Sequence, residues 1–262
     1  MTRVFVTNDD GIDAEGLRRL AVAAYTAGLQ VVVAAPRIEY SGSSAAIIAS
    51  RRDGRVPVDE RQLAGLDGVP AYAVSAPPAL ITLIAVRGGF GPPPKVVLSG
   101  INRGANTGRV VLHSGTVGAA LTAAAHGCPA LAVSLDVGAG AEGPAHWDTA
   151  ARLAVGLLPT VLAAAAAVVF NINVPDAPPS GVRGLRRASL ASFGAVQTNI
   201  EVGTGYVRLA LADTDSVQQP GTDAAWLAAG YATLTPLGPI CEASGVVLPE
   251  LSGRPTPHGT GS

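Results

Sequence analysis

The sequence predicts an α/β protein, a three-layer α/β/α sandwich built on a mostly parallel, Rossmann-like sheet. Three observations support this fold class. Short runs of apolar, β-branched residues alternate with stretches that are long enough for helices. The runs are apolar throughout, as is typical of strands that are covered on both faces. The chain has 262 residues, of which only 14% are charged, so it can bury a sizeable core.

The strands and helices follow from the positions of the apolar runs and of helix-ending residues. The run at 4–6 predicts the first strand. Gly28 ends the helix predicted for 14–27, and the strand at 31–34 follows. The other predicted strands are 71–74, 95–99, 130–134, 168–174 and 231–236, and the other predicted helices are 79–86, 115–126, 147–158 and 222–230.

The chain is predicted to form one domain over residues 1–252. Residues 181–240 are expected to contain a C-terminal extension, because 181–217 is more polar than the rest. The alternation in YVRLAL (206–211) indicates antiparallel strands or a hairpin arm there. Residues 253–262, rich in glycine and proline, are predicted to be a disordered tail.

Composition excludes several classes of partner and of site. The formal net charge of −1 gives no electrostatic case for binding nucleic acid or an anionic membrane. Cys128 and Cys241 are the only cysteines, which argues against a disulfide framework or a zinc site. Residues 153–170 are uncharged, but Pro159 interrupts them, so a helix followed by a buried strand is preferred to a membrane span. The opening MTRVFV lacks a signal-peptide pattern, and we expect a cytoplasmic protein.

Polar side chains gather after three predicted strands. TNDDG (7–11), APRIEYSGSS (35–44) and GINRGANTG (100–108) each follow an apolar run. Ligands of open parallel sheets bind beyond the carboxyl ends of the strands. If these ends converge, the carboxylates of Asp9 and Asp10 join a hydroxyl and an amide in an all-oxygen set that suits Mg²⁺ or Mn²⁺. Each loop taken alone is also explained by turn or helix-cap chemistry.

A fourth polar stretch, HSGTVG (113–118), leads into the helix predicted to begin at Gly115. The free N–H groups at the start of a helix bind anions, so a phosphate could be held there without a basic patch. A plain helix cap is the alternative interpretation.

Together these stretches resemble the SurE family, metal-dependent 5′-nucleotidases also called survival protein E. SGINRGAN (99–106) and SGTVGAA (114–120) carry the resemblance most specifically. TNDDG precedes them, and GTD, GY and TPL (between 221 and 237) follow them in the family's order. The resemblance extends from residue 1 to about 240. The sequence is therefore identified as a member of this family.

The resemblance implies a ligand set, a reaction and an assembly. One divalent cation per subunit, Mg²⁺ or Mn²⁺, would be bound by Asp9, Asp10, Ser41 and Asn102. The implied reaction is the hydrolysis of a nucleoside 5′-monophosphate to a nucleoside and inorganic phosphate. The implied assembly is a homodimer or homotetramer formed through the C-terminal extension.

We assign roles to these residues as hypotheses. Asp9 or Asp10 orients or deprotonates the attacking water. The groups expected to hold the phosphate oxygens are Asn102, Asn106, Ser114, Gly115 and Thr116.

Three stretches depart from the family pattern and lose polar residues. TGRV (107–110) stands where the family usually has acidic or amide residues, and Arg109 either contacts phosphate or faces solvent. SAPPALIT (75–82) and Leu121-Thr122 stand where the family has acidic or thiol side chains. These departures motivate an alternative function, a catalytically weak or specialised member that binds or dephosphorylates another phosphorylated metabolite.

Overall fold

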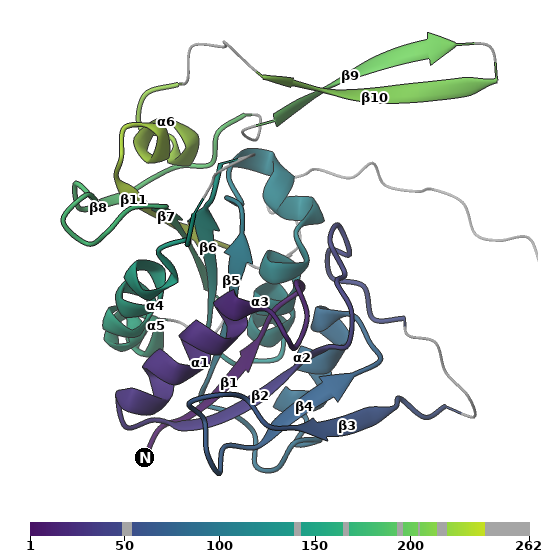
Figure 1. The fold of residues 1–262 in the computed structure, drawn as a ribbon, viewed down its shortest axis with the longest axis vertical. Coiled ribbons are helices and arrows are strands. Elements are labelled where there is room, and N and C mark those ends of the chain that lie inside the picture. The colour runs from purple at the N-terminus through teal and green to yellow at the C-terminus, as the bar shows by residue number, and fades with distance from the viewer. Residues whose placement is uncertain are drawn as a thin grey trace, which may run out of the picture.

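A nine-stranded mixed sheet runs through the centre of the protein (Figure 1). Neighbouring strands are parallel except at the β3/β4 and β7/β11 pairs, which confirms the mostly parallel sheet. In sheet order the strands are β3 (Val58–Arg61), β4 (Ala71–Val74), β2 (Gln30–Pro36), β1 (Arg3–Thr7), β5 (Val96–Arg103), β6 (Ala130–Asp136), β7 (Val169–Pro175), β11 (Ala232–Leu237) and β8 (Leu185–Arg187). The computed structural model describes residues 1–48, 54–138, 143–164, 168–192, 196–203, 205–213 and 219–238.

Helices cover both faces of the sheet and complete the three layers. Alternate residues of β1 enter different cores: Val4 and Val6 pack with α1 (Glu15–Thr26) and α4 (Trp147–Gly156), whereas Phe5 faces α2 (Pro78–Val86) and α3 (Gly115–Ala125). Two buried clusters on opposite faces explain why the strand sequences are apolar throughout.

The structure adds four elements that the sequence pattern did not predict: the strands β3 and β8, a helix and a 3₁₀ helix. The strand β3 has the sequence VDER and is exposed along its length, so it carries no apolar signal. A separate helix, α5, runs over Leu158–Ala163. Pro159 lies in its first turn, the part of a helix where proline is tolerated. The short 3₁₀ helix η1 (Gly108–His113) leads into α3. None of the helices in the described ranges is both long and apolar enough to span a bilayer.

The C-terminal extension contains the expected hairpin. The strands β9 (Val196–Gly203) and β10 (Tyr206–Asp213) pair antiparallel along their whole length and project from the body as an arm (Figure 1). The helix α6 (Asp223–Ala228) then leads back to β11 at the sheet. The tail predicted for 253–262 lies outside the described residues.

The order of the central strands brings three polar loops to one edge. The strand β1 lies between β2 and β5 and is parallel to both. Their carboxyl ends are therefore neighbours, as the sequence predicted, and the loops that follow them meet there.

Candidate active site

A tight turn after β1 presents Asp9 and Asp10 at this edge. The side chain of Asn8 closes the turn: its Nδ2 donates to the Gly11 carbonyl at 3.0 Å, and its Oδ1 accepts from the Gly11 amide at 3.2 Å. Gly11 has a φ of 105°, which glycine adopts far more readily than other residues. Asn8 and Gly11 thus supply the turn chemistry, and the two aspartates are left for another role.

Asp9 is a buried carboxylate with 4% of its surface exposed. The Thr116 hydroxyl donates a hydrogen bond to its Oδ1. Burial raises the pKa of Asp9, and hydrogen bonds from the Thr116 side chain and from the amides of Thr116 and Gly115 oppose this rise. The Thr116 side chain in the first turn of α3 is therefore a direct partner of the Asp9 carboxylate.

Asp10 is partly exposed and connects the ends of β1 and β5. Its Oδ2 accepts a hydrogen bond from the Arg103 amide at 3.2 Å. Burial, followed by the negative charges of Asp9 and Glu39, raises the pKa of Asp10 to about 6. In the part of the chain that the structure describes, neither Asp9 nor Asp10 forms an ion pair with a basic side chain.

The loop after β2 lies against Asp9. The Tyr40 amide donates to the Asp9 carbonyl at 2.8 Å, which anchors the loop. Ser41 is exposed and donates its hydroxyl proton to the Glu39 carboxylate. The sequence analysis did not select Glu39. A carboxylate two positions before the predicted ligand Ser41 could have been recognised as a group near the site.

Ser43 is a second residue that sequence reasoning missed. Its Oγ is buried and has no hydrogen-bond partner among the described residues. A Cβ built on Gly115 would lie 2.7 Å from this oxygen and 2.8 Å from Oδ2 of Asp9. A buried hydroxyl without a partner is unfavourable, and this one lies beside a carboxylate. Ser43 is therefore a candidate contact for a bound ligand.

Asn102 lies at the end of β5, next to the acidic pair. Its Nδ2 donates to the Gly104 carbonyl at 2.7 Å, which leaves the side-chain oxygen for another partner. The adjacent Arg103 amide is the group that binds Asp10. The structure thus brings Asn102 and Asp10 to neighbouring positions on one edge.

Asn106 is held by strands on the other side of the loop. Its amide donates to Asn173 Oδ1 at 2.7 Å, and its carbonyl accepts from Asn171 at 2.8 Å and from Asn173 at 3.0 Å. Its own Nδ2 donates to Ser134 Oγ at 2.9 Å. These contacts direct the Asn106 side chain towards β6.

The start of α3 combines a helix cap with contacts to the acidic pair. Ser114 is the N-cap residue, and its Oγ accepts from the Val117 amide at 3.1 Å, as the cap interpretation expected. Thr116 binds Asp9, and Gly115 lies against both Asp9 and Ser43. Two of the predicted phosphate contacts, Gly115 and Thr116, therefore lie beside Asp9, and Ser114 precedes them as the helix cap.

The departures from the family pattern have structural counterparts. Ala76, Ala79 and Ile81 are fully buried at the start of α2, so their apolar side chains serve the core. Arg109, near the start of η1, is exposed to solvent, and so is His113 at its end. The departures therefore leave the predicted ligands Asp9, Asp10, Ser41 and Asn102 unchanged.

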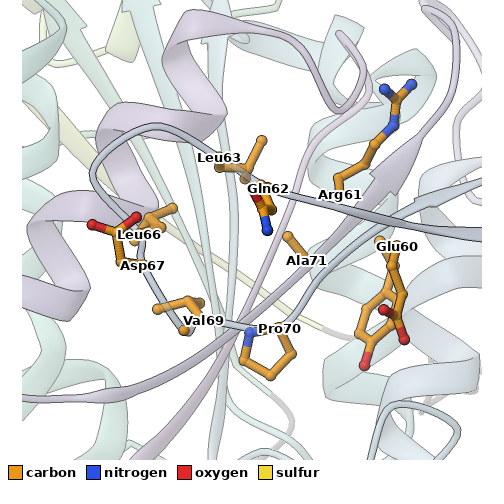
Figure 2. Close-up of a pocket in the computed structure, with 11 residues that line it drawn as sticks. Glu60, Arg61, Gln62, Leu63, Leu66, Asp67, Val69, Pro70 and Ala71 are labelled. Atoms are coloured by element: carbon orange, nitrogen blue, oxygen red, sulfur yellow. The ribbon is translucent and has the colours of Figure 1, made fainter.

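A surface hollow lies at the other edge of the sheet. Residues 60–63 and 66–72 line it (Figure 2), and it opens beside Ala71, where β4 begins. Because β4 is parallel to β2, this is the amino-terminal edge of the sheet, opposite to Asp9 and Asp10. No predicted site residue lines this hollow.

Comparison with known proteins gives a consistent assignment. The family model described as "Survival protein SurE" matches residues 4–195. A 5′-nucleotidase SurE from Aeromonas hydrophila is 35% identical over 243 residues, with 90% of this chain and 91% of the relative covered. A 5′/3′-nucleotidase SurE from Edwardsiella ictaluri is 36% identical, with 90% and 89% covered. The crystal structure of the SurE protein from Aquifex aeolicus is similar in fold, with a TM-score of 0.71, 24% identity, and 90% and 93% of the two chains covered.

Proposed function

Because the chain belongs to the SurE family, we propose that it is a phosphomonoesterase that hydrolyses nucleoside 5′-monophosphates to nucleoside and inorganic phosphate. The observation that carries this proposal is the pair Asp9 and Asp10. Two carboxylates with raised pKa values lie together at the carboxyl edge, and neither forms an ion pair among the described residues. Such an arrangement costs stability unless a ligand offsets it.

The residues at this edge suit a divalent cation. Asp9, Asp10, Ser41 and Asn102 offer oxygen donors, the set that Mg²⁺ and Mn²⁺ prefer. The described residues contain no group of three or more His, Cys, Asp or Glu side chains, so the nitrogen and sulfur ligands typical of zinc are not gathered here. When bound, a divalent cation lowers the pKa of a water and neutralises phosphoryl charge.

The protein groups then have separate tasks. The Thr116 hydroxyl fixes the Asp9 carboxylate in position. Asp9 and Asp10 share the tasks of binding the cation and orienting the attacking water. The Ser43 hydroxyl, which has a proton to donate, binds a phosphate oxygen.

The other proposed phosphate contacts are Asn102 and, at the start of α3, Ser114, Gly115 and Thr116. Asn106 contributes indirectly, since its side chain is bound to Ser134 and its backbone to β7. The alternative of a catalytically weak member is not favoured, because all four predicted ligands are present and the relatives named above are nucleotidases.

The test is the Asp10→Asn variant, assayed for phosphate release from AMP and other phosphomonoesters with Mg²⁺, Mn²⁺ or EDTA. We expect kcat/KM to fall by about a hundredfold or more, because the amide loses the charge that binds the cation. Asp13→Asn is the matched control, since Asp13 follows the same turn with 76% of its side chain exposed. Full activity of Asp10→Asn, or an equal loss in Asp13→Asn, would contradict the assignment of Asp10 to the active site.

The assembly is a separate proposal. The projecting β9–β10 arm fits a homodimer or homotetramer that forms through the C-terminal extension. Light scattering on a variant that lacks residues 196–213 tests this proposal, and an unchanged number of subunits per particle would contradict it.

A further inference from the structure

We infer that Asp223, a buried carboxylate in the C-terminal extension, is a positioning residue for the active-site loop that joins Asn102 to Ser114. The inference rests on the proposed function, because it assigns Asp223 a role in the same reaction. The side chain lies in the first turn of α6, on a part of the chain that the ligand set does not include.

Three backbone amides from different segments converge on this carboxylate. Its Oδ2 accepts from Gly108 at 2.8 Å, and its Oδ1 accepts from Ala191 and Ala224, both at 2.9 Å. Asp223 is 0% exposed. A carboxylate has only acceptor positions, so it can satisfy donors on both of its oxygens at once. An asparagine in this place would turn its NH₂ group towards at least one amide.

The contact with Gly108 fixes the middle of the active-site loop, where η1 begins. Gly108 has a φ of 59° and begins η1, which ends where Ser114 caps α3. The Ser44 side chain binds the carbonyl of Leu112 in η1 at 2.7 Å, so the loop that carries Ser41 and Ser43 rests on η1 as well. A shift of η1 would therefore move groups on both sides of Asp9.

A second anchor holds the same loop two residues earlier. Asn171 and Asn173 bind the backbone of Asn106, as described above. This anchor lies between Asn102 and Gly108, so it fixes the Asn102 side of the loop. Only the Asp223 contact ties the start of η1 to the C-terminal extension in the described hydrogen bonds. Loss of Asp223 should thus loosen the α3 side while Asn102 stays in place.

The neighbouring Thr222 allows this role to be separated from the stability of α6. Thr222 is the N-cap of α6, and its Oγ1 accepts from the Ala225 amide at 3.3 Å. Thr222→Ala removes that cap and should lower the melting temperature, without removing any bond to Gly108. It is the matched control for a change that merely weakens α6.

The test compares Asp223→Asn, Asp223→Ser and Thr222→Ala in the full chain. Steady-state phosphate release from AMP with Mn²⁺ gives kcat and KM, and amide hydrogen exchange without metal or substrate reports on the segment 104–116. We expect Asp223→Asn to lower kcat/KM by roughly tenfold to a hundredfold and to speed exchange in 104–116. Thr222→Ala should keep kcat/KM within about twofold and leave that exchange unchanged.

The readouts separate the possible failures. If Asp223→Asn does not fold, the same measurements on Asp223→Ser test the inference. The serine side chain is smaller and has no NH₂ group to face the amides that donate to Asp223. Unchanged exchange in 104–116, or an equal loss of kcat/KM in Thr222→Ala, would overturn the inference. If the unaltered protein hydrolyses no phosphomonoester, the proposed function fails, and the exchange measurement still decides whether Asp223 holds the loop.

Discussion

The glycine at 115 offers the most direct test of how closely the acidic pair and the phosphate contacts are packed. In Gly115→Ala, the new Cβ would lie 2.7 Å from Ser43 Oγ and 2.8 Å from both Cβ and Oδ2 of Asp9. Ordinary contacts begin at 3.4 Å, so Asp9 would have to move by about 0.6 Å (3.4 − 2.8). Distances in metal sites hold to about 0.2 Å, so this shift should disturb cation binding.

The expected result is a loss of activity with a small loss of stability. We expect kcat/KM for AMP, and the affinity for Mn²⁺ measured by calorimetry, to fall by roughly tenfold to a hundredfold. The overpacking costs about 1–3 kcal/mol, which the lower backbone entropy of alanine partly offsets, so the protein should stay folded.

Gly156→Ala is the matched control for this change. Gly156 ends α4, and a Cβ built there meets nothing within 4 Å. This variant should keep full activity and gain a few tenths of a kcal/mol, up to about 1 kcal/mol, in the free energy of unfolding. If Gly115→Ala binds Mn²⁺ and hydrolyses AMP as the unaltered protein does, Asp9 is not a ligand held at that position.

Two further predictions concern Ser43 and the acidic pair. Ser43→Ala should lower kcat/KM by about tenfold and leave thermal stability unchanged, because the hydroxyl has no partner among the described residues; a drop in melting temperature with full activity would contradict its proposed contact with phosphate. Because the pKa of Asp10 is raised from 3.8 to about 6, the metal-free folded protein holds this proton longer than the unfolded chain does. Its free energy of unfolding should therefore fall as pH rises through that window, and Mn²⁺ should raise the melting temperature more at pH 7 than at pH 5. Equal Mn²⁺ shifts at both pH values would argue against a cation at this pair.

The sequence predicted the strands and helices whose side chains are buried in a regular pattern. It missed elements such as β3 that form because another strand pairs with them. The buried residues of the strand β1 and the helix α3 are nearly all apolar or small, and this regular signal is readable in the sequence. The strand β3 has four exposed residues and exists because it pairs with β4. No local pattern distinguishes such an edge strand from a polar loop.

The same distinction applies to the site. The positions of Asp9, Asp10 and Asn102 follow from the strand order, in which β1 lies between β2 and β5. The sequence predicted a mostly parallel sheet and left the convergence of these strand ends as a condition. Ser43 could not be chosen over Ser44, because both stand in one polar run and only the packing of α3 leaves one hydroxyl without a partner. The role of Asp223 depends on a contact with a residue 115 positions away, which periodicity cannot reveal.

The charges at the carboxyl edge explain why the proposed reaction needs a cation. A phosphomonoester adds a charge of about −2 near neutral pH to a site that already holds two carboxylates. The amides of Gly115 and Thr116 lie at the start of α3, where the Thr116 hydroxyl binds Asp9. A divalent cation bound by Asp9 and Asp10 would cancel their charge and leave these amides and Ser43 to bind the ester. Phosphate affinity and cation affinity should therefore be coupled, and each should weaken when the other ligand is absent.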